Sequence, residues 1–173
     1  LSSTWVGGSV PVADDDVIIK NTHNVTLSDT RPCTSITIEA GATLTHAGTL
    51  DNSSTFLNQG TVHWTSGTFA GAGSITNDGT LNINGFENHN TASNITNNAG
   101  KTINWNDGHL DQAAGGQTLT NHGTFNLISN PGGLSCKMAI VNTGAITKPA
   151  GGSSLFISLP FDNQATGLVT LVA

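Results

Sequence analysis

Charged side chains are scarce in this chain, because Asp, Glu, Lys and Arg together make up 9% of its 173 residues. Five Lys and Arg face 11 Asp and Glu, which gives a formal net charge of −6. A nucleic-acid partner requires a basic face that neutralises phosphates, so this charge balance argues against one. The same balance disfavours an anionic membrane surface.

Long apolar runs and helix-length amphipathic stretches are also missing, which argues against a membrane-spanning segment and against a helical domain. Tyr is absent, whereas Gly, Thr, Asn and Ser are abundant. The apolar residues are regularly patterned, which disfavours disorder. We therefore predict a soluble, almost all-β chain. Its lysine-poor composition and its start at Leu1 predict a secreted protein, extracellular or on the cell surface.

One phrase recurs along most of the chain: an apolar residue, then Asn-x-Gly, then Thr and an alternating strand, as in ITNDGTL at residues 75–81. In the first two repeats Lys20 and Glu39 take the place of Asn. The bends are separated by 19 to 23 residues and fall at Thr22, Gly41, Gly60, Gly79, Gly100, Gly123, Gly144 and Gly167. A period of about 20 residues fits one coil of a parallel β-helix, and stacked Asn side chains can bond along the column.

The sequence thus predicts a right-handed parallel β-helix, or β-solenoid, of about 7–8 coils. Residues 1–17 are interpreted as a short N-terminal cap, and residues 18–173 as the repeats of a single domain.

Alternation assigns the two faces of each strand. Trp64 and Trp105 fall on the apolar side, so core packing is favoured over a role as sugar-stacking platforms. The opposite side predicts one flat polar face, made of Thr61, His63, Thr80, Asn82, Thr102, Asn104, Thr124 and Asn126.

Residues 64–83 follow the pattern W-x-x-G-x-[FIL]-x-G-x-G-x-[IL]-x-N-x-G-T-[LVF]-x-[IL], and residues 105–127 follow it less cleanly. This run resembles the repeats of bacterial secreted and surface β-solenoid proteins, including adhesins and autotransporter passengers. The opening TWVGGSVPVADDDVIIKNTHNVTL is similar to the segment that begins such arrays. The resemblance implies a scaffold fold that serves many purposes.

No catalytic constellation is found in the sequence. β-Helix polysaccharide lyases and hydrolases need clustered carboxylates, whereas the acidic residues here fall at different phases or several coils apart. We predict no enzymatic activity and no cofactor. The nearest approach to a metal site is a weak candidate set for a divalent cation, Glu87, His89, His109 and Asp111, which could face one another across two coils.

The two cysteines each lie 8 residues before a bend glycine, which predicts one column with the pair five coils apart. That separation is about 24 Å by strand spacing, against a limit of about 7 Å between the Cα atoms of a disulfide. Cys33 and Cys136 are therefore predicted to be free, buried thiols.

The β pattern continues to the last residues without a polar closing segment. An open solenoid end invites another strand. The leading hypothesis is an extracellular structural protein that assembles head to tail with copies of itself into a filament or surface layer. Its predicted assembly interface is Trp5, Val6, Leu168, Val169, Leu171 and Val172. The alternatives are an adhesin-type module that binds extracellular polysaccharide or another surface, an ice-binding face and a polysaccharide-degrading enzyme.

Overall fold

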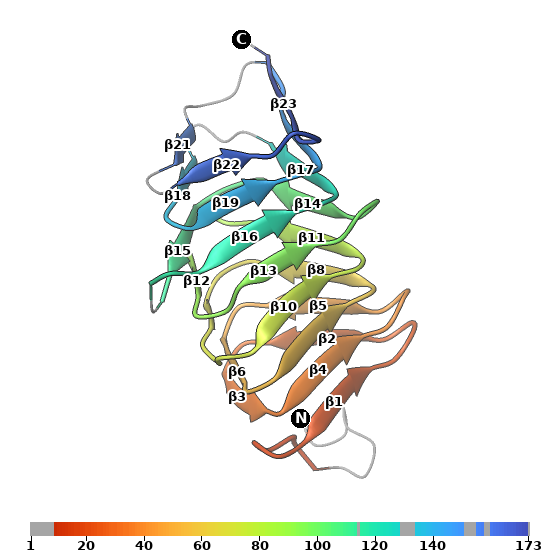
Figure 1. Ribbon diagram of the computed structural model, residues 1–173. Helices are drawn as coiled ribbons and strands as arrows, with labels where there is room; N and C mark the ends of the chain where they lie inside the picture. The colour runs from red at the N-terminus through yellow and green to blue at the C-terminus, as the bar shows by residue number, and fades with distance from the viewer. Residues whose placement is uncertain (1–8, 114, 129–133, 151–154, 158–159, 173) are drawn as a thin grey trace.

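The computed structural model describes residues 9–113, 115–128, 134–150, 155–157 and 160–172. Their strands form three parallel sheets in a β-solenoid of about seven turns, and successive strands of the chain pass from one sheet to the next (Figure 1). This confirms the predicted fold class. Within these ranges there is no helix that is long and apolar enough to cross a membrane.

The first sheet, sheet A, holds the strand that opens each coil. Its order is β1 (Asp16–Ile19), β4 (Ser35–Ile38), β7 (Thr55–Asn58), β10 (Ser74–Asn77), β13 (Ile95–Asn97), β16 (Thr118–Asn121), β19 (Ala139–Asn142) and β22 (Phe161–Asn163).

Sheet B follows sheet A across the bend that the sequence marks with glycine. Its order is β2 (Asn24–Leu27), β5 (Thr43–His46), β8 (Thr61–Trp64), β11 (Thr80–Ile83), β14 (Thr102–Trp105), β17 (Thr124–Leu127), β20 (Ala145–Lys148) and β23 (Leu168–Leu171).

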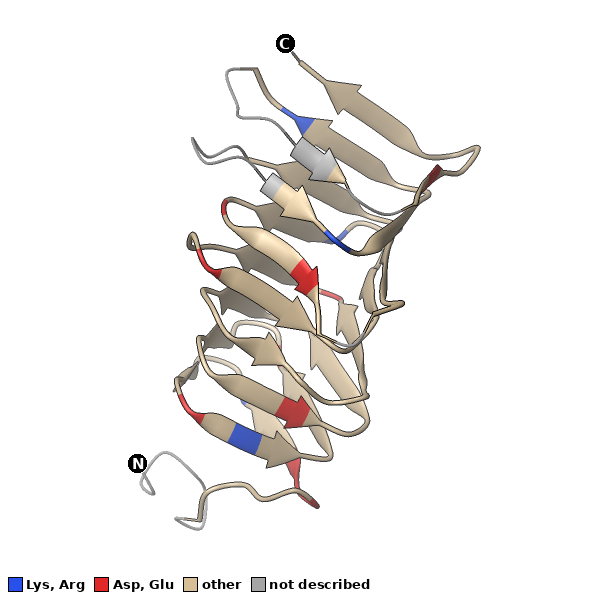
Figure 2. Cartoon of the chain, turned by 90° about the vertical axis from the view of Figure 1, so that its left-hand side faces the viewer, with Lys and Arg blue, Asp and Glu red and all other residues tan. Residues whose placement is uncertain are grey.

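Sheet C closes each coil. Its order is β3 (Thr30–Cys33), β6 (Thr49–Asn52), β9 (Thr68–Phe69), β12 (Asn88–Thr91), β15 (His109–Gln112), β18 (Leu134–Cys136) and β21 (Leu155–Ile157). Strands of sheet A run from left to right across the near side of the molecule in Figure 1. Figure 2 views the molecule from the left-hand side of Figure 1, and there the strands of sheet C run back toward the side of sheet A. The coil is therefore right-handed, as predicted.

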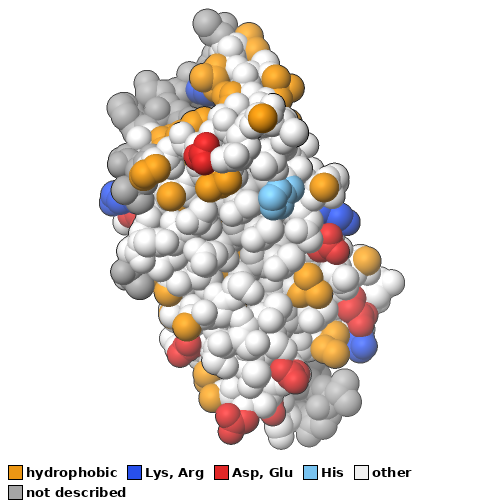
Figure 3. Space-filling view, in the orientation of Figure 1, with side chains coloured by type: hydrophobic (Ala, Val, Ile, Leu, Met, Phe, Trp, Pro, Cys, Tyr) orange, Lys and Arg blue, Asp and Glu red, His pale blue; other side chains and the backbone are white. Residues whose placement is uncertain are grey.

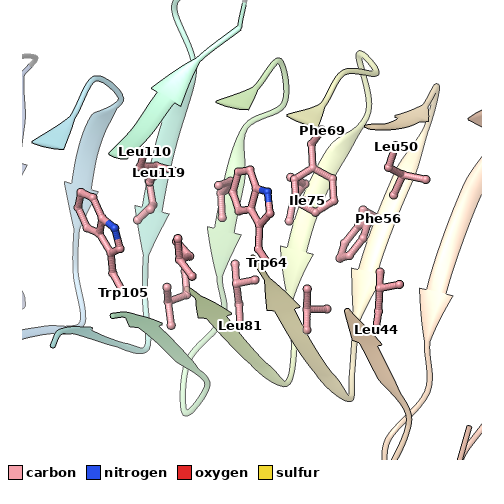
Figure 4. Close-up of a cluster of buried hydrophobic side chains, with 14 of the residues drawn as sticks. Leu44, Leu50, Phe56, Trp64, Phe69, Ile75, Leu81, Trp105, Leu110 and Leu119 are labelled. Carbon is pink, nitrogen blue, oxygen red and sulfur yellow. The ribbon is translucent and has the colours of Figure 1, made fainter. Parts of the chain in front are cut away.

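The core is a continuous apolar column inside the three sheets (Figure 4). Trp64 and Trp105 are fully buried, which confirms the predicted inward phase. The ring of Phe69 lies edge-on to Trp64, with a centroid distance of 4.7 Å, and packs against Phe56 at 5.0 Å. Alternate residues of each strand supply this core because successive side chains of a β-strand point to opposite faces.

The outer surface carries few charges (Figure 2). On the side of sheet A, the surface is mostly uncharged and polar, and hydrophobic side chains gather toward its C-terminal end (Figure 3).

Candidate functional sites

The predicted polar face lies on the outer side of sheet B. Thr61, Thr80, Thr102 and Thr124 pair in register, and His63, Asn82, Asn104 and Asn126 form the neighbouring column. All eight are partly exposed. The structure therefore brings together every residue of the predicted face.

The asparagines of this face bond to one another. The side-chain amide of Asn126 donates to Oδ1 of Asn104, and that of Asn104 donates to Oδ1 of Asn82, each at 2.9 Å. Thr147 continues the column by donating its hydroxyl to Oδ1 of Asn126 at 2.6 Å. This outer ladder fixes the side chains in a regular row, so the face is ordered as well as polar.

The four metal candidates are not brought together. His89 points into the solenoid and is fully buried, whereas His109 is partly exposed on the next coil and Glu87 lies in the preceding loop. Asp111 forms an ion pair with Lys137 at 3.1 Å. The described residues contain no group of three or more His, Cys, Asp or Glu able to hold a metal ion.

His46 and His89 are fully buried, which the sequence analysis did not predict for either residue, although strand alternation places both on an inward phase. The His46 ring packs against Phe69 at a centroid distance of 4.3 Å, and the His89 ring lies edge-on to Trp64 at 5.2 Å. Burial lowers the pKa of His46 to about 4. It also lowers the pKa of His89, although backbone carbonyls of Asn84 and His109 partly oppose this effect.

Both cysteines are buried and free, which confirms the prediction. Burial is the main reason that the pKa of each thiol is raised to about 11. Both lie in sheet C, on β3 and β18, but they do not share a column as expected. Cys33 pairs with Asn52, whereas Cys136 pairs with Leu110 and through it with His89. Loops of unequal length between the sheets account for this shift, which counting from the bends did not reveal.

A second, inner ladder of asparagines runs along the corner between sheets A and B. The side-chain amide of each member except the last described one donates to Oδ1 of the member in the next coil, at 2.7 to 2.8 Å. The ladder consists of Asn58, Asn77, Asn97, Asn121, Asn142 and Asn163. All but Asn163 are essentially inaccessible to solvent. The predicted bonding along the Asn column is confirmed.

In the first two coils the position of this ladder is occupied by isoleucine. Ile19 pairs with Ile38, and Ile38 pairs with Asn58. The sequence assignment of Lys20 and Glu39 to this column was wrong by one residue. Those two side chains point outward and form a salt bridge of 2.8 Å. Counting back from the bend failed because the corners differ in length.

Corners of two lengths join sheet A to sheet B. Four long corners, residues 20–23, 39–42, 98–101 and 164–167, each close with a backbone hydrogen bond between their end residues. Gly100 in such a corner has a φ of 75°, the left-handed conformation that glycine tolerates. In the short corner of Gly79, an added Cβ would lie 2.2 Å from the carbonyl oxygen of Gly60. There glycine is required by the close approach of stacked backbones.

The last described coil exposes the apolar interior. A hollow of about 630 Å³ opens there, lined mainly by apolar side chains such as Phe125, Leu127, Ile146 and Val169. Leu168, Leu171 and Val172 are 59%, 63% and 49% exposed. We call this surface, with Phe161 and Asn163, the C-terminal end face. It contains four of the six predicted assembly residues, of which Val169 is half-buried and packs against the core.

The other two predicted assembly residues, Trp5 and Val6, lie outside the described residues. At that end, Val10 and Pro11 of the predicted cap line a hollow of about 280 Å³ together with core residues such as Val17 and Leu27. The first strand within the described residues begins at Asp16.

The stacked parallel sheets define this chain as a β-solenoid repeat protein. A family model of the G8 domain matches residues 4–131, which is more than half of the chain, so the protein belongs to the G8 domain family. The strands from β18 onward lie beyond the matched residues. Neither a curated protein nor a solved structure matches the chain.

Proposed function

We propose that this chain is a structural β-solenoid that is extended end to end, through its C-terminal end face, into a filament or surface layer outside the cell. The observation that carries the proposal is the exposed apolar end of the coil stack. The resemblance to repeats of bacterial surface and secreted proteins and the low content of charged residues support it.

The geometry favours a stacking partner at this face. Within the described part of the chain, β22 and β23 are the edge strands of sheets A and B, so each offers backbone groups to a further parallel strand. The exposed Leu168, Leu171 and Val172 lie on or beside these edges. Covering a fully exposed side chain of this size contributes about 1.5–3 kcal/mol. A further coil would therefore gain both hydrogen bonds and apolar burial.

The partner in this proposal is another solenoid chain, of which a copy arranged head to tail is the simplest case. Negative-stain electron microscopy across a concentration series tests it. We expect ordered fibres whose axial repeat is about one subunit length and whose number increases with concentration.

A charge placed on the end face sharpens this test. Leu171→Lys should prevent fibre formation because it introduces an ammonium group at the contact. Thr102→Lys, on the outer face of sheet B, is the matched control and should leave fibres intact. Monodisperse short rods of the unmodified chain at every concentration would contradict end-to-end assembly.

A second candidate function is binding of extracellular polysaccharide through the outer face of sheet B, as in an adhesin. The ordered Thr and Asn columns favour it, because they repeat polar groups at the spacing of the strands. Retention of the chain on a glycan array, lost in a Thr102→Lys and Asn104→Lys double variant, would support this function. Retention that is unchanged in the double variant would exclude this face.

A further inference from the structure

We propose that Asn84 and Gly85 form a self-modifying site, at which the backbone nitrogen of Gly85 displaces the side-chain amide of Asn84. His63 and Asn106 are its catalytic residues, because both contact the reacting amide. The products are aspartate and isoaspartate, and the co-reactant is water. This chemistry goes beyond the proposed function and does not depend on any contact at the ends of the coil stack.

Asn84 is the only asparagine of the chain that is followed directly by glycine. In the recurring phrase the order is Asn-x-Gly, so another residue separates the two. The adjacent glycine matters because the attacking nitrogen belongs to the next residue, and glycine has no side chain to shield that nitrogen or restrict its backbone. The sequence therefore singles out one asparagine among many.

The fold requires glycine at this position. Gly85 has a φ of 92°, in the left-handed region, and an added Cβ would lie 2.5 Å from the carbonyl oxygen of Thr65. Within the described residues, the backbone N–H of Gly85 donates no hydrogen bond, so its nitrogen is free to react. Asn84 is partly exposed and Phe86, at the tip of the same loop, is 74% exposed. Water can therefore reach the site.

Other side chains hold both ends of the Asn84 amide. Nδ2 of Asn106 donates to Oδ1 of Asn84 at 2.7 Å, and Nδ1 of His63 lies 3.4 Å from Nδ2 of Asn84. The carbonyl oxygen of Asn82 is a second neighbour of that Nδ2, also at 3.4 Å. His63, Asn84 and Asn106 belong to three successive coils, on or directly after β8, β11 and β14. The stacking of coils is what brings them together.

These contacts suit the displacement of an amide. When the nitrogen of Gly85 attacks Cγ of Asn84, negative charge develops on Oδ1, and a donor fixed against that oxygen stabilises it. The amide nitrogen must gain a proton before it leaves, and an imidazole beside it can supply one. Asn106 is therefore the oxyanion donor, and His63 is the proton donor.

The reaction balances with water as the only added reagent. A bond forms between the nitrogen of Gly85 and Cγ of Asn84, and the bond from Cγ to Nδ2 breaks. Ammonia leaves with the proton that Gly85 gives up, relayed through His63. Water then opens the succinimide ring. Opening at the side-chain carbonyl gives aspartate, whereas opening at the main-chain carbonyl gives isoaspartate, whose main chain runs through the former side chain.

Two Asp-Gly pairs allow an internal comparison, because aspartate can form the same ring. The backbone N–H of Gly108 already donates to Oδ1 of Asp107 at 2.6 Å. Asp78, before Gly79, forms a salt bridge of 3.6 Å with Lys101. A negatively charged carboxylate also resists attack by a nitrogen more than a neutral amide does. Conversion should therefore be faster at Asn84 than at either aspartate.

The modification changes the surface and a core contact. In the aspartate product, a negative charge enters a row of neutral amides at the edge of sheet B. In the isoaspartate product, the main-chain carbonyl of Asn84, which accepts from Nε2 of the buried His89 at 2.8 Å, becomes a free carboxylate. Isoaspartate should therefore disturb the loop and the buried ring together, whereas aspartate leaves the path of the main chain unchanged.

The test is to incubate the folded full chain at neutral pH and to follow the peptide that contains residue 84 by mass spectrometry. Enzymatic methylation specific for isoaspartate separates the two products. We expect conversion at Asn84 before any other asparagine. His63→Gln and Asn106→Ala should each slow it about tenfold, since each removes one assisting group. His122→Gln and Asn98→Ala make the same changes elsewhere on the surface and are the matched controls, which should leave the rate unchanged.

Incubation in denaturant separates the contribution of the fold from the intrinsic reactivity of Asn-Gly. The unfolded variants and the unmodified chain should convert at one common rate, because the contacts between coils are gone. Circular dichroism checks that each variant is folded before the native incubation. Equal rates for folded His63→Gln, folded Asn106→Ala and the folded unmodified chain would overturn the inference. It would also be overturned if Asn84 stayed intact in the folded chain while the unfolded chain converted.

Discussion

The first two coils and the later coils place different kinds of side chain at the corner between sheets A and B. In the ladder column, Ile19 and Ile38 continue the apolar core, whereas the column from Asn58 onward is a chain of buried amides. The first two corners are closed by their own backbone turns. The corner after Asn97 is closed in the same way, yet its column residue is still an asparagine.

This difference shows that the asparagines are required by hydrogen bonds to the neighbouring coils as well as by the local turn. An amide in the middle of the ladder has a donor below it and an acceptor above it, so each asparagine makes the next one necessary. Where the ladder meets isoleucine, Oδ1 of Asn58 is left without a partner among the described residues. The buried amides stabilise the fold where they bond to one another. Where the ladder meets an apolar residue, a buried polar atom without a partner costs free energy.

The largest expected effect comes from breaking the ladder in its middle. Asn121→Leu removes one accepted bond from Asn97 and three donated bonds, and leaves buried partners unsatisfied. The free energy of unfolding should fall by about 3–5 kcal/mol, measured by urea denaturation. Asn104→Leu, in the partly exposed outer ladder, is the control and should lower it by less than about 1 kcal/mol. Equal losses would mean that burial of the inner ladder adds nothing.

Acid should weaken the lower coils, which contain both buried histidines. The pKa of His46 in the folded chain, about 4, lies below its ordinary value of 6.5, so the unfolded chain takes up this proton first as pH falls. Stability is therefore lost between pH 6.5 and about 4 and stays low below that window. The loss from His46 should be roughly 3 kcal/mol.

The control for this acid sensitivity is His46→Leu, which replaces the imidazole by an apolar side chain between Leu27 and Trp64 in its column. Chemical denaturation at a series of pH values should show a flatter profile for this variant between pH 6.5 and 4. A profile parallel to that of the unmodified chain would exclude His46 as the source of the acid sensitivity.

The two kinds of corner should respond differently to an added methyl group. Gly79→Ala forces stacked backbones apart, because the new Cβ would meet the carbonyl oxygen of Gly60, and should cost about 2–3 kcal/mol. Gly100→Ala has open space and meets only the strain of its left-handed φ, about 1–2 kcal/mol. Thermal unfolding of both variants measures the difference. A larger loss for Gly100→Ala would contradict the close-approach argument.

The smallest expected effect concerns the thiols of Cys33 on β3, at one end of sheet C, and Cys136 on β18, the strand next to the other end. Because burial raises the pKa of Cys33 and Cys136 to about 11, alkylation of the folded chain near pH 8 should be slow for both. Unfolding in denaturant should release two reactive thiols, counted by mass spectrometry. Rapid labelling of only one cysteine in the folded chain would show that its end of the solenoid opens separately.

Much of the fold could be read from the sequence because the relevant patterns are local. The recurring Asn-x-Gly-Thr phrase predicted the coil, and period-two alternation placed Trp64 and Trp105 inside. The same argument identified the Thr and Asn columns of sheet B. Successive members of each column lie on neighbouring coils and pair in register. The free thiols were also predicted correctly, because five coils separate their strands.

Other features could not be read in this way because corner and loop lengths vary between coils. Counting from the bend placed Lys20 and Glu39 in the ladder, although the longer corner moves Ile19 and Ile38 there. Unequal loops also separate the columns of Cys33 and Cys136. His89 and His109 looked like partners across neighbouring coils, yet their side chains point to opposite sides of the sheet.

The sequence by itself determined the repeating coil, its inner and outer faces and its low charge, since strand alternation and turn chemistry act over a few residues. The tertiary structure alone decided which corner residues join the inner ladder, which histidines are buried and which amide is left at the end face. These outcomes depend on contacts between residues as far apart as Asn97 and Thr124, 27 positions along the chain. Such contacts exist only after the coils have stacked in one register, and an insertion in a corner or loop changes the sequence spacing between the residues that stack.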